Sequence, residues 1–364
     1  MREFIEEVCE RNYLNHNFSG VCMLKVKGET VFAKAYGYAN RAFRAPNEID
    51  TRFDTASITK LFTAAAVLQL IERGRLSFDD KITDIIDLSG TEIPADVTIE
   101  HLLNHTSGIA DDADEENGED YSALFAEYPN YAIRECRDFL KNFAYKKPNF
   151  KAGTNVRYCN CAYILLGLAI EKVTGMNYRD YVVQNVFEKA GMGDSGFFSM
   201  DGVNENTAEG YVSITDENDN IIGYKKNIYC YPPKGTPDGG AYTTAEDLNK
   251  FLAAIKDNIL LGKEFAEIFF TPHCEFSHPE DWYGIPGLYE RNGYAFEFFM
   301  LPDSDEPFCI YKDGANDGVS AKLSYYPAED ITLVLLANQN CNVWAMTREI
   351  QLEIYKRSVK INRG

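Results

Sequence analysis

A serine and a lysine, Ser57 and Lys60, stand three residues apart at the start of the apolar stretch TASITKLFTAAAVLQL. In a helix, positions three apart lie on one face, so the hydroxyl and the amine can touch. A serine becomes a good nucleophile when a base takes its proton, and a lysine becomes a base when burial lowers its pKa. The positive end of the helix dipole favours both changes. The pair predicts a nucleophile, although its spacing alone arises by chance about once in such a chain.

A tyrosine and an asparagine, Tyr158 and Asn160, stand where a loop meets the apolar segment 160–174. A phenol acts as a general base when neighbouring cations lower its pKa, and an amide can orient both the lysine and a substrate. The same Tyr-x-Asn spacing occurs at three other tyrosines in different contexts: Tyr13, Tyr38 and Tyr128. The pattern is therefore informative only together with the serine and the lysine.

A third group of residues, Lys312 to Ala315, ends the strand-like run 307–312. Lys312 supplies a cation, and Gly314 lets the backbone approach an acyl group closely. The backbone amide of Ala315 can pair with that of Ser57 as an oxyanion hole. Adjacent residues on a strand point to opposite faces, so Asp313 is expected to face away from Lys312 and to meet either a basic residue or the substrate.

The elements that must position these residues follow from periodicity and turn signals. Lys27-Gly28 predicts a β-hairpin within 20–40, and Gly74 ends a helix over 57–73. Further helical patterns cover 2–14, 98–104, 131–143, 160–174, 178–190, 243–255 and 342–357, and strand-like runs cover 293–301, 307–312, 320–326 and 331–338. Strands at both ends predict an α/β (α+β) fold with an antiparallel sheet from residues 1–86 and 236–364. Residues 87–235 are expected to form a mainly helical domain, with the active site between the two domains.

Taken in order, Ser57-Ile-Thr-Lys60, Tyr158-Cys-Asn160 and Lys312-Asp-Gly314 resemble the three motifs of serine β-lactamases and penicillin-binding proteins. The segments TIEHLLNHTSGI, GGAYTTAEDLNKFLAAI and YPAEDITLVLLANQ resemble further parts of the class C-like branch, which includes D-aminopeptidases, D,D-carboxypeptidases and esterases. The resemblance covers roughly residues 20 to 345. It implies a β-lactamase-like fold and a serine hydrolase that works through an acyl-enzyme.

The resemblance also implies roles for the individual residues. Ser57 would be the acylated nucleophile, and Lys60 and Tyr158 would share the general base and acid duty. Asn160 would position groups, and Lys312 would bind a substrate carboxylate or assist electrostatically. Asp313 departs from the pattern, which commonly has a hydroxyl residue there. An acid at this point should repel carboxylate substrates or favour a cationic group, so β-lactams are expected to be weak substrates beside esters, amides and D-amino-acid peptides.

Composition limits the partners. The formal net charge of −20 argues against nucleic acid and against anionic membrane surfaces, and the substrate is expected to be a small molecule or a short peptide. No apolar run is long enough to span a membrane, and the first residues lack the core of a signal peptide, which predicts a cytoplasmic protein. The nine cysteines contain no C-x-x-C pair, so no zinc site is expected. The family resemblance implies a hydrolase that works without a metal or other cofactor.

Three other patterns favour structure over chemistry. Asp194-Ser195-Gly196 resembles a trypsin-like motif but lies in a helical context. His101 and His105 have metal-ligand spacing without a third ligand, so packing and capping are expected. The acidic run 111–120 has no apolar anchor, so a solvated loop is expected. A calcium loop lacks the required spacing there, and a mobile flap beside a cleft is the third option. A catalytically weak penicillin-binding or scaffolding protein that retains the fold remains the alternative to an active hydrolase.

Overall fold

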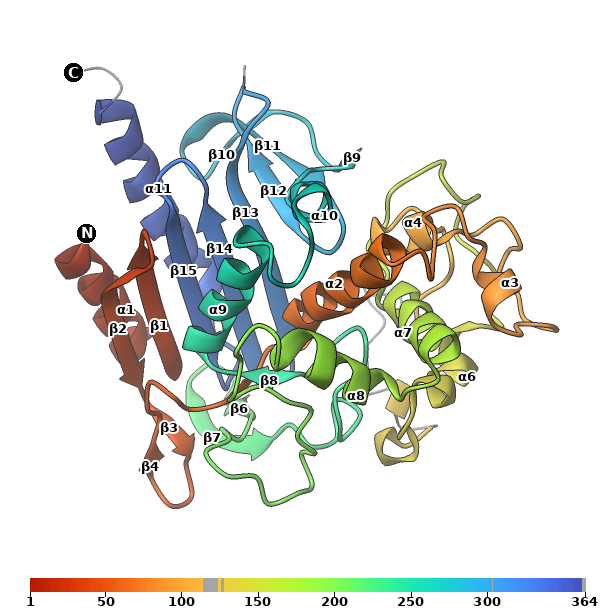
Figure 1. Cartoon of the computed structure of the whole chain (residues 1–364). Coiled ribbons are helices and arrows are strands. Elements are labelled where there is room, and N and C mark those ends of the chain that lie inside the picture. The colour runs from red at the N-terminus through yellow and green to blue at the C-terminus, as the bar shows by residue number, and fades with distance from the viewer. Residues whose placement is uncertain (114–123, 126–127, 303, 362–364) are drawn as a thin grey trace.

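A large antiparallel sheet forms the centre of the molecule (Figure 1). The structure is a computed structural model that describes residues 1–113, 124–125, 128–302 and 304–361. Within these residues the sheet has nine strands in the order β10-β11-β12-β13-β14-β15-β1-β2, with β9 paired to β11. The strands are β1 Gly20–Val26, β2 Glu29–Tyr36, β9 Cys274–Glu275, β10 Glu280–Trp282, β11 Ile285–Asn292, β12 Glu297–Met300, β13 Pro307–Asn316, β14 Val319–Tyr326 and β15 Ile331–Ala337. The expected α/β fold with an antiparallel sheet is confirmed.

The two ends of the chain meet in this sheet. Strand β1 pairs with β15 from Gly20 opposite Ala337 to Val26 opposite Ile331. The β1–β2 hairpin turns at Lys27 and Gly28, whose φ angles are 53° and 81°. Positive φ at both central residues is the geometry of a type I′ turn, which matches the twist of the strands. The N-terminal hairpin thereby extends the C-terminal meander of strands.

Helices cover both faces of the sheet (Figure 1). The terminal helices α1 (Arg2–Asn15) and α11 (Val343–Ile361) pack on one face in an apolar cluster that also contains Cys22 and Leu24 of β1. The alternate residues Val21 and Met23 of β1 join the cluster on the other face, which contains α9 (Ala245–Lys256) and α10 (Lys263–Phe269). This period of two follows from the pleat of a strand.

One helix crosses the core beneath the sheet. Helix α2 (Thr59–Glu72) is buried along every residue from Thr59 to Leu70. It packs against α7 (Asn160–Thr174) and against α8 (Tyr178–Val182), which continues as a π-helical turn, η5 (Val183–Phe187). The remaining short helices on this side are α3 Ile82–Ile85, α4 Ile99–Leu103, η3 Asn130–Ala132, η4 Cys136–Phe139 and α6 Leu140–Phe143.

One local prediction from periodicity is wrong. The segment 131–143 forms η3, η4 and α6 instead of one helix, because Glu135 and Asp138 build a capping box that starts a new turn. The segment expected to be mainly helical also contains the hairpin β6 (Tyr211–Thr215) and β7 (Ile221–Lys226). Short pairs complete the structure: β3 Tyr38–Asn40 with β4 Ala45–Pro46, and β5 Phe53–Asp54 with β8 Tyr242–Thr243.

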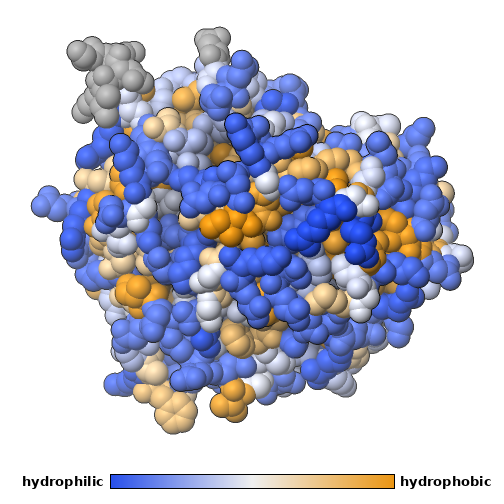
Figure 2. All heavy atoms as spheres, viewed as in Figure 1, coloured by the Kyte–Doolittle hydropathy of each residue, from blue (hydrophilic) through white to orange (hydrophobic). Residues whose placement is uncertain are grey.

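The surface is largely hydrophilic on the face that Figure 2 shows, with hydrophobic side chains in separate groups. All nine cysteines lie in the described part of the chain and are free thiols. In that same part, no helix combines the length and apolar character that a membrane crossing requires.

Candidate active site

Ser57 lies in a tight turn just before α2. The turn η1 (Ala56–Ile58) is 3₁₀, so the serine precedes the helix that was expected to begin at 57. Ala56 has a φ of 42°, which is unusual for a residue with a side chain, and its N–H donates to Oδ1 of Asp54 at 2.7 Å. Burial raises the pKa of the Asp54 carboxyl to about 6. The carboxyl group therefore stabilises a strained conformation next to the serine.

Strand β13 approaches this turn closely. A Cβ atom added to Gly314 would lie 2.2 Å from the carbonyl oxygen of Thr55, so only glycine fits. Gly314 therefore acts by packing against the turn, while its neighbours Asp313 and Ala315 line the cavity beside Ser57. This contact sets the distance between β13 and the turn that carries Ser57.

Lys60 is fully buried and donates three hydrogen bonds. Its Nζ lies 3.0 Å from Oγ of Ser57, 2.8 Å from Oδ1 of Asn160 and 2.6 Å from the carbonyl oxygen of Asp238. Three acceptors match the three protons of an ammonium group. Lys60 is thus a proton donor to Ser57 in this arrangement. Sequence reasoning missed Asp238, whose backbone supplies the third acceptor.

Tyr158 completes the cluster around Ser57. Its hydroxyl lies within hydrogen-bonding reach of Ser57 and Lys60, and the ammonium groups of Lys60 and Lys312 lie 5.0 and 4.7 Å from its ring centroid. Burial raises the pKa of Tyr158, and the nearby Lys60 partly opposes that rise. The phenol is therefore neutral near pH 7. The structure brings Ser57, Lys60, Tyr158 and Asn160 together at one point.

His101 and His105 serve packing and helix capping. The ring of His105 packs against that of Tyr158 in a tilted arrangement with centroids 4.5 Å apart, and its Nδ1 accepts the N–H of Cys159 at 3.2 Å. Burial lowers the pKa of His105 well below its usual value, and the nearby lysines lower it further. His101 forms a capping box with Thr98 at the start of α4. Packing and capping, as expected, account for both residues.

The first residues of the acidic run hold helix α7 in place. The carboxylate of Asp111 accepts the N–H groups of Asn160 and Cys161 at 2.8 and 2.9 Å, and Asp112 is buried. The prediction of a solvated loop is therefore wrong for these two residues. An acid at a helix N-terminus satisfies free N–H groups and complements the helix dipole. The rest of the run, 114–120, lies outside the described residues.

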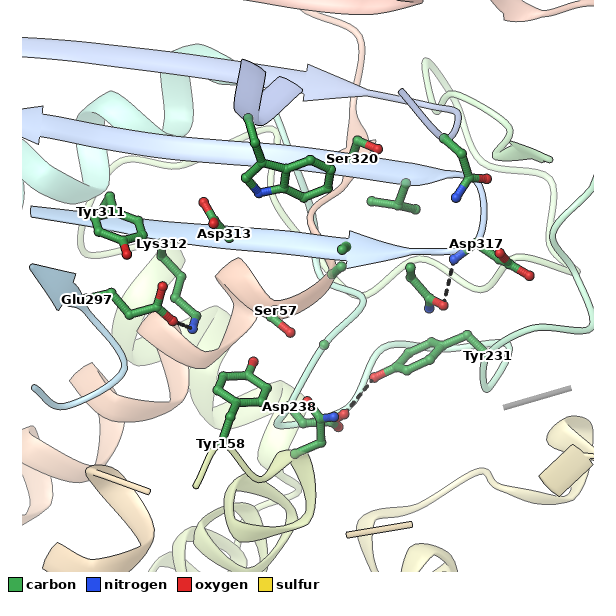
Figure 3. Close-up of a pocket in the computed structure, with 18 of the residues that line it drawn as sticks. Ser57, Tyr158, Tyr231, Asp238, Glu297, Tyr311, Lys312, Asp313, Asp317 and Ser320 are labelled. Atoms are coloured by element: carbon green, nitrogen blue, oxygen red, sulfur yellow. Dashed lines mark hydrogen bonds and ion pairs between the residues drawn. The ribbon is translucent and has the colours of Figure 1, made fainter. Parts of the chain in front are cut away.

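Residues of the third motif form two ion pairs, and Figure 3 shows the one between Lys312 and Glu297. Lys312 of β13 pairs with Glu297 of β12 at 2.6 Å, and Asp313 pairs with Lys322 of β14 at 2.7 Å. Glu297 was missed from the sequence. Its only signal is a single acid in the apolar run AFEFFM, opposite the third motif once β12 and β13 pair.

These residues surround a cavity of about 630 Å³. The aromatic side chains in its lining are Tyr158, Tyr231, Phe276, Tyr311 and Trp344. The acidic side chains in its lining are Asp238, Glu290, Glu297, Asp313 and Asp317. Figure 3 shows Ser57 between β13 and Tyr158. In this cavity a serine is hydrogen-bonded to a buried lysine and lies near a tyrosine and a second lysine on a strand. This arrangement defines a serine hydrolase of the β-lactamase and penicillin-binding-protein type.

The chain belongs to the beta-lactamase family, because the model of the family described as Beta-lactamase matches residues 9–353. It is 28% identical over 355 residues to Penicillin-binding protein 4* of Bacillus subtilis (strain 168), covering 93% of this chain and 72% of that protein. It is 30% identical over 300 residues to the putative penicillin-binding protein PbpX of the same strain, covering 80% of this chain and 68% of that protein.

Solved structures agree with this assignment. A penicillin binding protein from Bacillus halodurans superposes with a TM-score of 0.86 at 35% identity, covering 96% of this chain and 99% of that one. A D-amino acid amidase from Ochrobactrum anthropi SV3 shares the fold, with a TM-score of 0.76 at 20% identity, covering 100% of this chain and 99% of that one. The resemblance noted in the sequence and the β-lactamase-like fold are confirmed.

Proposed function

We propose that this serine hydrolase forms an acyl-enzyme on Ser57 and acts on small esters, amides or short D-amino-acid peptides, with β-lactams as weak substrates. The observation that carries the proposal is the 3.0 Å hydrogen bond between Lys60 and Ser57 at the wall of the cavity. A volume of about 630 Å³ lies in the range typical of small-molecule sites.

The proton balance of the cluster defines the active form. Lys60 donates all three protons of its ammonium group in hydrogen bonds, and Tyr158 is a neutral phenol. In this protonation state neither group can accept the Ser57 proton. The reactive form has lost the phenol proton of Tyr158. A Tyr158 phenolate flanked by the ammonium groups of Lys60 and Lys312 then serves as the general base.

The reaction then proceeds in two stages. Oγ of Ser57 attacks the carbonyl carbon while its proton passes to Tyr158, the bond to the leaving oxygen or nitrogen breaks, and Tyr158 protonates that leaving atom. Water next attacks the acyl-enzyme and gives a proton to Tyr158, and Ser57 recovers a proton as the acid departs. The backbone amides of Ser57 and Ala315 would stabilise the oxyanion, and Asn160 would hold Lys60 in place.

A fluorophosphonate probe tests this proposal. The expected result is stoichiometric labelling that peptide mass spectrometry locates on Ser57, together with steady turnover of a neutral ester such as p-nitrophenyl acetate. The matched control is Ser57→Ala, which removes the nucleophile and keeps the lysine and tyrosine. Labelling at another residue, or turnover by the Ser57→Ala variant equal to that of the unaltered enzyme, contradicts the proposal.

The alternative is a catalytically weak penicillin-binding or scaffolding protein. The same experiment separates it from the hydrolase, because such a protein would be labelled or acylated once at Ser57 and would not turn over further ester. A single burst of p-nitrophenol equal to the enzyme concentration, with no turnover afterwards, would favour this alternative.

A further inference from the structure

Acidic side chains outnumber basic side chains in the lining of the cavity. Among the described residues that line it, five are aspartate or glutamate and one, Lys312, is lysine. Three of the carboxylates lie on the wall formed by the neighbouring strands β11, β12 and β13: Glu290, Glu297 and Asp313. Figure 3 shows Glu297 beside Lys312 on one face of β13 and Asp313 on the opposite face. The chemistry of this wall therefore differs from that of a carboxylate-binding site, which needs an accessible cation.

The two lysines of the wall are the buried members of their ion pairs. The side chain of Lys312 is 2% exposed while that of Glu297 is 22% exposed, and the values for Lys322 and Asp313 are 7% and 32%. A ligand that enters the cavity thus meets carboxylate oxygens before it meets ammonium groups. Each recorded ion pair uses one oxygen, Oε1 of Glu297 and Oδ1 of Asp313, and a carboxylate has further lone pairs to offer.

Aromatic side chains add to this character. Tyr231, Phe276, Tyr311 and Trp344 line the same cavity. An aromatic face attracts a cation through the negative potential above its ring. Carboxylate oxygens combined with aromatic faces form a lining that suits an ammonium group and disfavours an anion.

The geometry points to substrates that carry a positively charged group, such as a primary or quaternary ammonium, attracted to the β12–β13 wall by the negative charges of Glu297 on one face of β13 and Asp313 on the other. This inference rests on the proposed function, since it names the substrate class of the Ser57 site. It assigns Glu297 and Asp313 to specificity, with Lys312 neutralised by Glu297 instead of free to bind a substrate carboxylate.

Matched ester pairs test the inference on the intact chain. Acetylcholine, which carries its charge on the alcohol side of the ester, is compared with its uncharged carbon isostere neohexyl acetate. The p-nitrophenyl ester of aminohexanoic acid, which carries its charge on the acyl side, is compared with that of hexanoic acid. At least one cationic ester should exceed its neutral partner at least tenfold in kcat/KM. Ratios near one in both pairs would overturn the inference.

Variants then locate the preference. Glu297→Gln and Asp313→Asn remove one negative charge each, and each should lower the cationic-to-neutral ratio at least threefold. The ratio cancels any general loss of activity, so a purely structural effect leaves it unchanged. Glu306→Gln is the matched control, because Glu306 is exposed, directly precedes β13 and lies outside the cavity lining. Equal ratios in the unaltered enzyme and in both wall variants would also overturn the inference.

Fluorophosphonate labelling keeps this test separate from that of the proposed function, because the probe is neutral. Labelling of Ser57 without a cationic preference refutes the charge selectivity alone. Absence of labelling and of turnover refutes the acyl-enzyme itself.

Discussion

Lys312 and Glu297 form an ion pair of 2.6 Å across adjacent strands, directly beside the Tyr158 ring. Through this pair the positive charge that the third motif brings to the cavity is largely compensated. Glu297 also raises the pKa of Tyr158, although less strongly than burial does. One side chain therefore weakens both carboxylate binding and phenolate formation.

Replacement of Glu297 by glutamine should release both effects. In Glu297→Gln, the ratio of kcat/KM for a carboxylate-bearing ester, mono-p-nitrophenyl adipate, to that for p-nitrophenyl hexanoate should rise at least tenfold. A lone charge about 5–6 Å from a carboxylate contributes about 3 kcal/mol at an effective dielectric of 20, so tenfold is a conservative expectation. An unchanged ratio would show that Lys312 does not reach the substrate carboxylate.

The sequence predicts what depends on contiguous residues. Lys27-Gly28 defines a hairpin turn, and the apolar segment 160–174 forms α7 with the same bounds. Residues of the three short motifs also line one cavity. This long-range arrangement could be expected only from the family resemblance, because local patterns carry no information about it. Local turn chemistry and family resemblance thus account for the predictable part.

The features that the sequence did not predict depend on strand register and on helix capping by residues far away in the chain. Glu297 reaches Lys312 only because β12 pairs with β13 in one particular register, which periodicity does not reveal. Asp111 caps α7 from 49 residues earlier in the chain, so its role looks like that of a surface acid until the chain is folded. Strand β11 was missed because its end, Glu290 to Asn292, is polar and does not alternate.

The activity should rise with pH in the neutral range. Burial holds the pKa of Tyr158 above its usual value of 10.0, so the phenolate fraction grows with every pH unit below that point. We expect kcat/KM for p-nitrophenyl acetate to increase between about pH 6 and pH 9, by up to about tenfold per unit. Tyr158→Phe should lower kcat/KM by about 10²–10⁴-fold and flatten the profile. A flat profile in the unaltered enzyme would exclude Tyr158 as the base.

Charge selectivity should also depend on pH, through Glu290. Burial raises the pKa of Glu290 to about 7, the hydrogen bond from Tyr311 opposes that rise, and Glu297 adds to it. The other charged or titratable groups that interact with it are Lys322, Asp313 and Tyr283. Glu290 is neutral below pH 7 and negative above it, so the cationic-to-neutral ratio of kcat/KM should rise about three- to tenfold from pH 6 to pH 8.

Glu290→Gln provides the check on that step. Glutamine keeps the size of the side chain and does not titrate, so the ratio of kcat/KM values should no longer change around pH 7. A rise that persists in Glu290→Gln would assign the titration to another group of the wall.

Loss of the Asp111 cap should loosen the helix that carries Asn160. In Asp111→Ala the N–H groups of Asn160 and Cys161 lose their acceptor, which should lower the free energy of unfolding by about 0.5–2 kcal/mol. Asp111→Asn keeps an acceptor oxygen and should recover most of the loss. Urea unfolding of both variants measures the difference. Equal stabilities of Asp111→Ala and the unaltered chain would show that water replaces the carboxylate at no cost.

Gly314 should tolerate no side chain, because β13 touches the turn that carries Ser57. In Gly314→Ala, the new Cβ would lie 2.2 Å from the Thr55 carbonyl oxygen, which is backbone and cannot rotate away. Either the strand or the turn must shift by roughly an ångström, and a misplacement of that size can lower kcat/KM about a hundredfold. Overpacking should also lower the free energy of unfolding by about 1–3 kcal/mol. Gly223→Ala in β7 is the matched control, since its nearest neighbour would be a flexible side-chain atom of Ile214 at 3.8 Å. Thermal unfolding and ester kinetics of the two variants decide the matter: normal activity and stability in Gly314→Ala would show that the contact between β13 and the Ser57 turn is not needed to position the nucleophile.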